Sequence, residues 1–339
     1  MAVTENSAIA HGDDFGKVLP SHLMWRCGMK LLEEKLNSAV SLKNTLFATD
    51  FSEISEKALP YAAAMSLRYG GMVHVAHVLP EINVVRPSPI DPVTIGSIYE
   101  DAHSGAQEKM QRLTARIKGF PHRTYIRRGK VSEVLSEIVC DQGIDLLMAG
   151  TRGRTGVGKL LMGSVAEEVF RTATCPVFTV GPKVPKLTSL PKHREPDEIG
   201  PTNVEFRRIL YATDFTSYSF AAASYAFSLA QEFDARLMLL HVIEEYGEHL
   251  HDRPGPIDKA LRKLEKLEPQ EAALRYSPEP MVEFGSPADR ILHIALEREA
   301  DLIVLGAHAL QPNAAAHLPW TTAHKVVAGA NCPVLTVRD

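Results

Sequence analysis

Short apolar runs alternate along most of the chain with longer segments in which apolar residues recur every three or four positions. This alternation is typical of strand–helix–strand units built around a parallel sheet. In the first half it predicts strands near 44–49, 72–78, 123–128, 145–149 and 176–180, and helices near 54–69, 98–118, 131–141 and 164–172. In the second half it predicts strands near 208–213, 235–242, 279–284, 301–305 and 333–337. Ser286 followed by Pro287 predicts a helix start there.

Segments of the first half recur in the same order in the second half. The clearest is LFATDF at 46–51, which returns as LYATDF at 210–215, 164 positions later. The others are HV at 77–78 and 241–242, DLLMAG at 145–150 matched by DLIVLG at 301–306, and CPVFTV at 175–180 matched by CPVLTV at 332–337. The matches are collinear, so the chain is a duplication whose halves share one fold.

The length of 339 residues suits two domains. We expect two tandem, doubly wound α/β domains, each with a five-stranded parallel sheet and helices on both faces, over 41–182 and 206–338. Between them, 183–205 predicts a proline-rich, semi-extended linker. Residues 1–40 have no counterpart in the second half and are expected to be a partly disordered extension. A helix near 22–37 and a start codon assigned too far upstream are both left open.

Composition excludes several classes of protein. Hydrophobic residues make up 45% of the chain and charged residues 23%, enough apolar content for a real core in each half. The formal net charge of −4 argues against nucleic-acid binding through a basic surface. No apolar run is long enough to span a membrane, and the first residues do not resemble a secretory signal. The four cysteines contain no CxxC pair, so a zinc site or disulfide framework is not expected, and we predict a cytoplasmic location.

The segment GTRGRTGVGKLLMGS at 150–164 carries the clearest candidate chemistry. It leaves a predicted buried strand and opens a predicted helix. Its glycines let backbone amides approach an anion, and the helix start adds the positive end of a dipole. Ser164 and Glu167 fit a capping box with Ser164 as the N-cap. Cations for a triphosphate would come from Arg152, Arg154 and Lys159.

Simpler interpretations of these residues stay open. A glycine-rich segment between strand and helix is often only a turn. GRTGVGK at 153–159 matches the start of a P-loop, but Leu160 replaces the hydroxyl residue that holds Mg²⁺, so we reject that interpretation.

Asp50 ends the first predicted strand and Gly150 ends the fourth, so both reach one crevice if these strands are neighbours. Asp50 would then contact ribose or adenine, cap the next helix, or do both.

With these residues in view, the sequence resembles the universal stress protein (UspA-like) family over both halves. The family's ATP-binding pattern G-x2-G-x9-G-[ST] is matched by Gly150, Gly153, Gly163 and Ser164. The resemblance implies strand order 3-2-1-4-5 in each domain, and ATP as the ligand of domain 1, with or without Mg²⁺. It implies that adenine and ribose lie near Thr49, Asp50, Val78 and Met148. It implies that the phosphates are lined by Gly150, Arg152, Gly153, Gly163, Ser164 and Val165.

The second half departs from this pattern. Ala309 stands where Gly153 does, Trp320 stands where Gly163 does, and two prolines remove backbone donors. We therefore predict that domain 2 binds no ATP. Because Asp214 is retained, a smaller nucleotide or metabolite is left open there.

Other polar groupings have simpler explanations. His249 and His251 lie among acidic residues, which indicates a charged surface loop more than a metal site, and Asp289 with His293 indicates a surface pair more than a catalytic dyad. Neither GxSxG nor HExxH occurs, so we assign no catalytic residue and no metal site. Packed or hydrogen-bonded histidines are expected at His77 and His241, and small buried residues at Cys175 and Cys332.

Three functional hypotheses follow. The leading one is a stress-response binding module regulated by ATP in domain 1. The second is a slow ATPase or autophosphorylating enzyme, which the absence of a convincing base disfavours. The third is a structural pseudo-dimer without ligand. In all three we expect the domains to pair through their last strands, which covers two apolar edges. Association of two chains into a homodimer is left open, and no nucleic-acid or membrane partner is expected.

Overall fold

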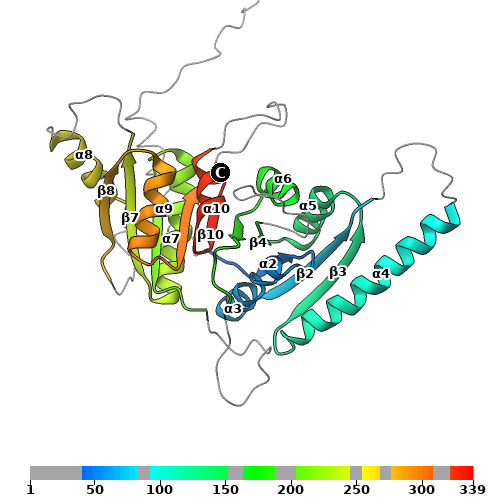
Figure 1. The fold of residues 1–339 in the computed structure, drawn as a ribbon. Coiled ribbons are helices and arrows are strands. Elements are labelled where there is room, and N and C mark those ends of the chain that lie inside the picture. The colour runs from blue at the N-terminus through cyan, green and yellow to red at the C-terminus, as the bar shows by residue number, and fades with distance from the viewer. Residues whose placement is uncertain are drawn as a thin grey trace, which may run out of the picture.

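The computed structural model describes residues 40–81, 92–151, 163–187, 204–244, 254–267, 276–307 and 321–338. Strands in these ranges form one ten-stranded sheet in the order β3-β2-β1-β4-β5-β10-β9-β6-β7-β8 (Figure 1). In domain 1 the strands are β1 Asn44–Ala48, β2 Met72–Leu79, β3 His122–Arg128, β4 Leu146–Gly150 and β5 Val177–Val180. In domain 2 they are β6 Arg208–Ala212, β7 Arg236–Ile243, β8 Glu279–Phe284, β9 Leu302–Gly306 and β10 Val334–Val337.

Each half of the sheet has the expected order, and all neighbours within a half are parallel. Every predicted strand is present, and no strand end differs from its predicted position by more than one residue. The predicted fold class is therefore confirmed. In each domain the first and fourth strands are neighbours, so the chain reverses its winding direction between them. In open α/β sheets a crevice that binds ligands is expected at the carboxyl ends of such strands.

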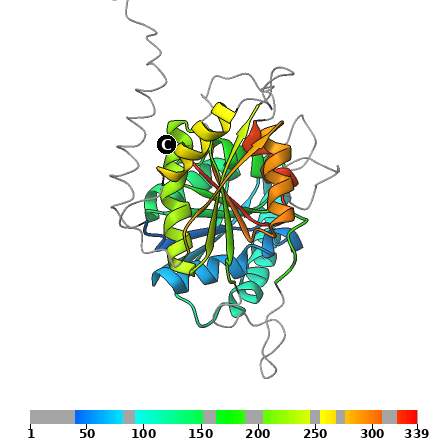
Figure 2. The same cartoon turned by 90° about the vertical axis from the view of Figure 1, so that its left-hand side faces the viewer.

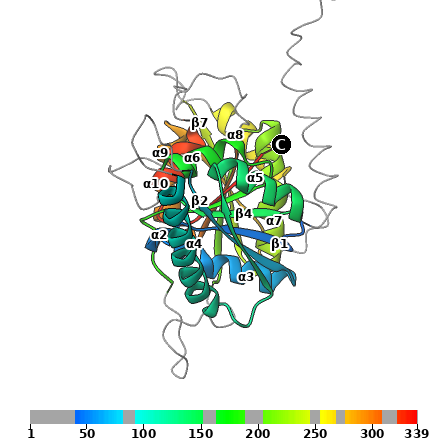
Figure 3. The same cartoon turned by 90° about the vertical axis from the view of Figure 1, so that its right-hand side faces the viewer.

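Helices cover both faces of the sheet. Domain 1 contains α2 Glu53–Glu56, α3 Leu59–Tyr69, α4 Pro92–Ala115, α5 Val131–Gln142 and α6 Ser164–Thr172. Domain 2 contains α7 Ser217–Phe233, α8 Pro254–Glu265, α9 Pro287–Glu297 and α10 Thr322–Gly329. Figure 2 shows α7 and α9 on opposite faces of the domain 2 sheet, and Figure 3 shows α3 and α5 in the same relation in domain 1. One buried cluster runs through both domains on the α3 and α7 side. The other side has a separate cluster in each domain.

The first helical segment of domain 1 differs from the prediction. Instead of one helix over 54–69, α2 ends at Glu56 and α3 begins at Leu59. Pro60 lies in the first turn of α3, where its missing N–H and its ring prevent a continuous helix from α2. Helix α9 begins after Ser286 with Pro287 in its first turn, as predicted, although the Ser286 side chain makes no capping hydrogen bond. The N-terminal extension and linker residues 188–203 lie outside the described residues.

The two domains meet along their last strands. β10 runs antiparallel to β5, with Val334 opposite Thr179 and Thr336 opposite Val177. Two threonine hydroxyls add bonds across the seam: Thr179 Oγ1 donates to the Val334 carbonyl at 3.1 Å, and Thr336 Oγ1 donates to the Val177 carbonyl at 3.2 Å. Both threonines are almost completely buried. The seam thus joins two parallel half-sheets into one continuous structure.

Helix α6 of domain 1 also packs on domain 2. Its Phe170 belongs to the buried cluster of domain 2 and lies 4.7 Å, ring centre to ring centre, from His324 of α10. Arg338, just after β10, donates to the Arg171 carbonyl at 2.7 Å and to the Ala173 carbonyl at 3.3 Å. A cation at the last carbonyls of a helix stabilises its negative end. Burial lowers the pKa of the Arg338 guanidinium to about 10, so Arg338 stays charged near neutral pH.

None of the described helices is long and apolar enough to cross a membrane.

Buried histidines make stability depend on pH. Burial lowers the pKa of His74, His241 and His324 below the ordinary value. All three are therefore neutral in the folded state at pH 7, while the unfolded chain protonates near pH 6.5. Below that pH the unfolded state binds more protons than the folded state, so the free energy of unfolding is highest above about pH 7 and decreases toward pH 5. Urea unfolding at several pH values measures this slope.

Two variants test whether His74 contributes to this pH dependence. His74 is 2% exposed, and its Nδ1 lies 2.9 Å from the Tyr125 hydroxyl. His74→Gln is expected to flatten the pH dependence, whatever its effect on absolute stability. The matched control is His103→Gln, at an exposed position on α4, which should leave the slope unchanged. Equal slopes in the wild type and His74→Gln would contradict a role for His74.

Candidate functional site

The candidate site lies at the carboxyl ends of β1 and β4, beginning with Thr49. The Thr49 side chain is buried, and its N–H donates to the Ala76 carbonyl of β2 at 2.9 Å. Its Oγ1 lies 3.0 Å from Ser55 Oγ and accepts the Phe51 N–H at 2.9 Å. The Ser55 hydroxyl donates to the Ser52 carbonyl at 2.9 Å, which leaves its lone pair for Thr49. Thr49 therefore holds the turn after β1 and does not present its hydroxyl to the crevice.

Phe51 takes a backbone conformation that is unusual for a residue with a side chain. Its φ is +59°, in the left-handed region. The Phe51 ring packs on His77 with a centre-to-centre distance of 4.4 Å. His77 Nδ1 donates to the Thr49 carbonyl at 2.8 Å, which confirms the predicted hydrogen-bonded histidine. Such a conformation costs about 1 kcal/mol or more, so the surrounding contacts must hold it in place.

Asp50 is half-buried between Thr49 and this turn. Its Oδ1 accepts the Ser52 N–H at 3.0 Å, a local turn contact. The alternative that Asp50 caps the next helix is wrong, because the N-cap of α2 is Ser52, whose hydroxyl accepts the Ser55 N–H. The structure therefore leaves Asp50 at the crevice and gives the capping role to its neighbour.

Gly150 ends β4 at a point of close packing. A Cβ there would lie 2.9 Å from Ser55 Cα and 3.0 Å from Ser55 N in α2. These distances are shorter than real Cβ contacts, and the atoms they involve are backbone, so α2 leaves no room for a side chain. Gly306 has the same relation to α7, with 2.5 Å to the Tyr218 carbonyl carbon. Packing alone therefore requires the first glycine of the motif in both domains.

The residues on either side of 152–162 are hydrogen-bonded to each other. Thr151 is buried, its N–H donates to the Val180 carbonyl at 3.0 Å, and its carbonyl accepts the Gly163 N–H at 2.9 Å. The two ends of the glycine-rich segment thus lie side by side at the carboxyl edge of β4 and β5. Arg152 and Gly153, with the rest of 152–162, lie outside the described residues.

The helix after the loop begins one residue earlier than the capping box predicts. Its N-cap is Gly163, which has no side chain to accept the first amides, and Ser164 is already helical. The Glu167 N–H donates to the Gly163 carbonyl at 2.8 Å, so the helical ladder starts at Gly163. Ser164 as the N-cap is therefore wrong. An anion at this helix start would meet amides that no capping side chain has satisfied.

The remaining predicted residues lie around this edge. Val78 is almost buried near the end of β2, and Met148 is completely buried in β4 within the core cluster. Val165 follows Ser164 in the first turn of α6. The topology thus brings Thr49, Asp50, Val78, Gly150 and Gly163 to one edge of the sheet. The Met148 side chain faces the core instead, so it supports the crevice from within.

The turn after β6 in domain 2 has nearly the same contacts as the turn after β1 in domain 1. Thr213 Oγ1 donates to Ser219 Oγ at 3.0 Å and accepts the Phe215 N–H at 3.0 Å. Phe215 has φ +63°, and its ring lies 4.4 Å from that of His241. His241 Nδ1 donates to the Thr213 carbonyl at 2.8 Å, as predicted. The geometry on which a nucleoside would rest is thus common to both domains.

The helix starts of the two domains differ. The N-cap of α10 is Thr321, whose hydroxyl accepts the His324 N–H at 3.4 Å. In addition, Asp214 accepts the Thr216 hydroxyl at 2.6 Å. Domain 2 therefore satisfies with its own side chains the groups that would otherwise face an anion.

The other groupings support no further chemistry. His249 and His251 lie outside the described residues, and within the described ranges no three metal-ligating side chains gather. His293 Nε2 lies 3.4 Å from Glu297, and both side chains are exposed, as expected of a surface pair, although the partner is not Asp289. Cys175 and Cys332 are buried just before β5 and β10, as predicted. Burial raises the pKa of the Cys175 thiol to about 11, so it is a poor nucleophile.

Comparison with known proteins identifies the family. The profile of the Universal stress protein family matches residues 41–181 and again residues 205–338. The chain belongs to the universal stress protein family. A universal stress protein of Mycolicibacterium smegmatis is 24% identical over 302 residues, which cover 86% of this chain and 96% of the relative. A universal stress protein of Thermus aquaticus is 34% identical over 137 residues, 39% of this chain and 99% of the relative.

A solved structure shares the two-domain fold. The universal stress protein of Archaeoglobus fulgidus superposes with a TM-score of 0.60 at 22% identity, covering 88% of this chain and 98% of that one. The tandem arrangement is therefore shared with other universal stress proteins over nearly the full length of both chains. At this identity the likeness concerns the fold alone.

Two parts of this universal stress protein site were missed by sequence reasoning. Ser55 supports Thr49, and its counterpart Ser219 supports Thr213, each six residues further along. The repeat itself contained that signal, because Ser55 and Ser219 share the offset of 164 positions. Thr151 was passed over because nothing in its sequence context distinguishes it from the other loop residues.

Glycine substitutions test the packing role. Gly150→Ala and Gly306→Ala are each expected to lower the free energy of unfolding by roughly 1–3 kcal/mol without any ligand, because the Cβ meets backbone. The effect should be at least as large at Gly306, where the contacts are shorter. The control is Gly105→Ala, in α4 with open space around it, which should raise stability by up to about 1 kcal/mol. An unaltered denaturation midpoint in Gly150→Ala would contradict this.

Proposed function

We propose that domain 1 of this universal stress protein binds ATP in the crevice at the carboxyl ends of β1 and β4, and that domain 2 does not. The observation that carries the proposal is the start of α6. Gly163 caps that helix without a side chain, directly beside the closed neck formed by Thr151 and Gly163. Backbone amides and the positive end of a helix dipole there suit a phosphate group.

The nucleoside side of the crevice fits the same ligand. Asp50 stands half-buried beside the rigid turn that Thr49 and Ser55 hold. A carboxylate in this place suits the hydroxyl groups of a ribose, which donate hydrogen bonds. Asp50 follows β1, and α6 is the next element along the chain after the neighbouring strand β4. A nucleotide, with its ribose at one end and its phosphates at the other, requires this spatial relation. When bound, ATP would bring its own charge to the loop, with Mg²⁺ as the natural counter-ion.

The corresponding residues of domain 2 support the conclusion that this domain binds no ATP. Its nucleoside turn is intact, but Thr321 caps α10, and Ala309 and Trp320 replace two glycines of the motif. A capped helix start offers an anion fewer donors, and side-chain bulk keeps the main chain away from phosphates. One nucleotide per chain is the expected stoichiometry.

A single substitution separates ATP binding from folding. Gly163→Asp places an acceptor at the N-cap, where φ −63° and ψ 148° accommodate any residue. We expect it to stabilise α6 by about 0.5 kcal/mol, because the carboxylate satisfies the first amides and the dipole. We expect the same change to weaken ATP binding at least about tenfold, because the site is then filled and negatively charged. Isothermal titration calorimetry on the full chain measures affinity and stoichiometry.

The matched control is Thr321→Asp at the N-cap of α10. It introduces the same charge at the equivalent helix of domain 2 and should leave ATP affinity unchanged. Two nucleotides per chain, or an equal loss in both variants, would contradict the assignment to domain 1.

We further propose that the domains stay paired through β5 and β10 in solution, and that ATP acts through this pairing on the protein's stress-response partners. Helix α6 supports this link, because its first turn borders the crevice and its Phe170 lies in the core of domain 2. A change at one end of a rigid two-turn helix is therefore felt in both domains.

Hydrogen exchange tests the pairing. Phe170→Ala removes a buried ring from the domain 2 cluster and should destabilise by about 3 kcal/mol. It should increase amide exchange in α10 and β10, although the substitution is in domain 1. The control is Val169→Ala, the preceding residue, which packs in the separate cluster of domain 1 and should affect α5 and β4 instead. Unchanged exchange in α10 of Phe170→Ala would refute the pairing.

A further inference from the structure

A cavity of about 830 Å³ lies between the two domains. One wall comes from domain 1 and the chain that leaves β5, with Tyr61 of α3 and Val184 and Leu187 after the strand. The opposite wall is α9, with Leu292 and Leu296. The cavity shares no lining residue with the nucleotide crevice described above. Its volume lies in the range of small-molecule sites, which often form at domain interfaces.

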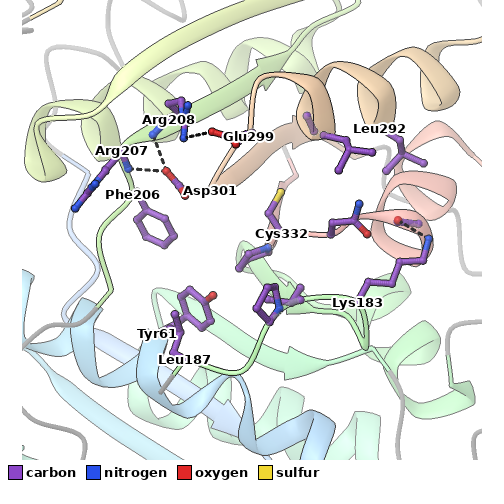
Figure 4. A pocket seen from close by; sticks show the side chains of 18 of the residues that line it. Tyr61, Lys183, Leu187, Phe206, Arg207, Arg208, Leu292, Glu299, Asp301 and Cys332 are labelled. Atoms are coloured by element: carbon purple, nitrogen blue, oxygen red, sulfur yellow. Dashed lines mark hydrogen bonds and ion pairs between the residues drawn. The ribbon is translucent and has the colours of Figure 1, made fainter. Parts of the chain in front are cut away.

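The position of the cavity follows from the antiparallel seam. The floor is made where β6, β9 and β10 begin, at Arg208, Asp301 and Cys332 (Figure 4). Because β10 runs opposite to β5, the beginnings of the domain 2 strands lie on the same edge of the sheet as the ends of the domain 1 strands. The cavity is therefore built by two chain regions that only the duplication brings together.

The charges in the floor are already paired. Arg208 forms an ion pair with Glu299 at 2.7 Å. Asp301 accepts the backbone N–H groups of Arg207 and Arg208 at 2.8 and 2.9 Å. At the rim, Lys183 Nζ donates to the Gly329 carbonyl at 3.0 Å. Figure 4 shows these contacts along the sides of the open space. A charged ligand would therefore find no uncompensated opposite charge in the floor.

The Tyr61 hydroxyl is a polar group that points into the cavity. The Tyr61 side chain is 6% exposed, and its hydroxyl makes no hydrogen bond within the described part of the chain. The Tyr61 ring is held by Phe206, at 6.0 Å between ring centres and nearly parallel. Figure 4 shows its hydroxyl directed into the open space. Burial, with smaller effects of Cys332 and Asp301, raises the pKa of Tyr61, so the hydroxyl stays neutral.

Most of the remaining lining is apolar. Two further carboxylates border the cavity: Glu205 pairs with Arg207, and Asp289 lies in the first turn of α9, where the helix dipole offsets its charge. Burial raises the pKa of the Cys332 thiol to about 12, so this group is an uncharged part of the wall. Leu296 at the rim is 62% exposed and adds apolar surface at the mouth of the cavity. The Tyr61 hydroxyl is open to the cavity, so a ligand atom placed there can form a hydrogen bond with it.

We propose that this cavity is a second ligand site, which binds an uncharged small molecule with an apolar body and one polar atom that hydrogen-bonds to the Tyr61 hydroxyl. The apolar body lies between Leu187, Leu292 and Leu296. Because both domains supply walls, the ligand stabilises their pairing. This site is independent of the proposed ATP site.

The neutral dye N-phenyl-1-naphthylamine tests the proposal on the full chain. It has two aromatic ring systems and one N–H, and its fluorescence rises in apolar surroundings. We expect saturable binding of one dye per chain. Leu296→Trp fills the mouth and should abolish the fluorescence increase. Leu67→Trp is the matched control, a leucine of α3 that is 47% exposed and lies outside the cavity, and it should bind like the wild type.

A second pair of variants tests the hydrogen bond. Tyr61→Phe should weaken dye binding about fivefold while leaving thermal stability unchanged or higher, because the lost hydroxyl had no partner. Its control is Tyr225→Phe, at the position of domain 2 that corresponds to Tyr61 by the offset of 164, which should have no effect on the dye. Gly163→Asp should keep full dye binding, which separates this site from the crevice.

Three results would overturn the proposal. The first is that Leu296→Trp binds the dye as well as the wild type does. The second is that Leu67→Trp loses as much dye binding as Leu296→Trp. The third is that Gly163→Asp no longer binds the dye. Circular dichroism melting of each variant distinguishes these outcomes from unfolding. Failure of ATP to bind the wild type would refute the proposed function and leave the dye result unaffected.

Discussion

The antiparallel contact between β5 and β10 is the constraint on which the rest of the molecule depends. Each domain alone would end in an apolar strand with unpaired backbone groups, a surface prone to further association. Joining these edges places Thr179 and Thr336 in reciprocal hydrogen bonds across the seam. It also reverses the direction of the second half-sheet relative to the first. The crevice edge of one domain and the opposite edge of the other therefore become neighbours.

Helix α6 connects the crevice edge of domain 1 with the core of domain 2. Its first turn borders the loop neck, Phe170 lies in the core of domain 2, and Arg338 reaches back from the end of the chain to its last carbonyls. Near the cavity, Lys57 after α2 donates to the Pro182 and Val184 carbonyls at 2.9 and 2.8 Å, which holds the chain that leaves β5 against domain 1. Lys183 in the same stretch donates to the Gly329 carbonyl of domain 2 at 3.0 Å. Both domains thus share structural elements instead of merely touching.

Much of the fold could be predicted from the sequence, because the apolar runs were regular and occurred twice. The break between α2 and α3 was missed even though Pro60 was visible, since a proline near a helix start is also compatible with one continuous helix. The error at Ser164 has a different cause. Serine is a better N-cap than glycine by propensity, and only the loop geometry at Thr151 and Gly163 shows where the ladder begins.

The candidate site was predicted less completely. Gly150 was assigned to phosphate binding by resemblance, yet its position is already explained by the approach of Ser55, a contact that requires the folded structure. Met148, expected near adenine and ribose by resemblance, has its side chain buried in the core. The cavity could not be predicted at all, because Tyr61, Phe206, Leu296 and Cys332 are widely separated in the sequence and have no motif in common.

The self-capped start of α10 has a consequence for how the two helices begin. A helix whose first amides are satisfied by its own Thr321 does not need a bound molecule to complete it. The bulky residues and prolines that precede α10 in the sequence therefore do not prevent this helix from starting. Gly163 gives α6 no such side chain, so the first amides of α6 take their hydrogen bonds from outside the helix, from the loop, from water or from a ligand.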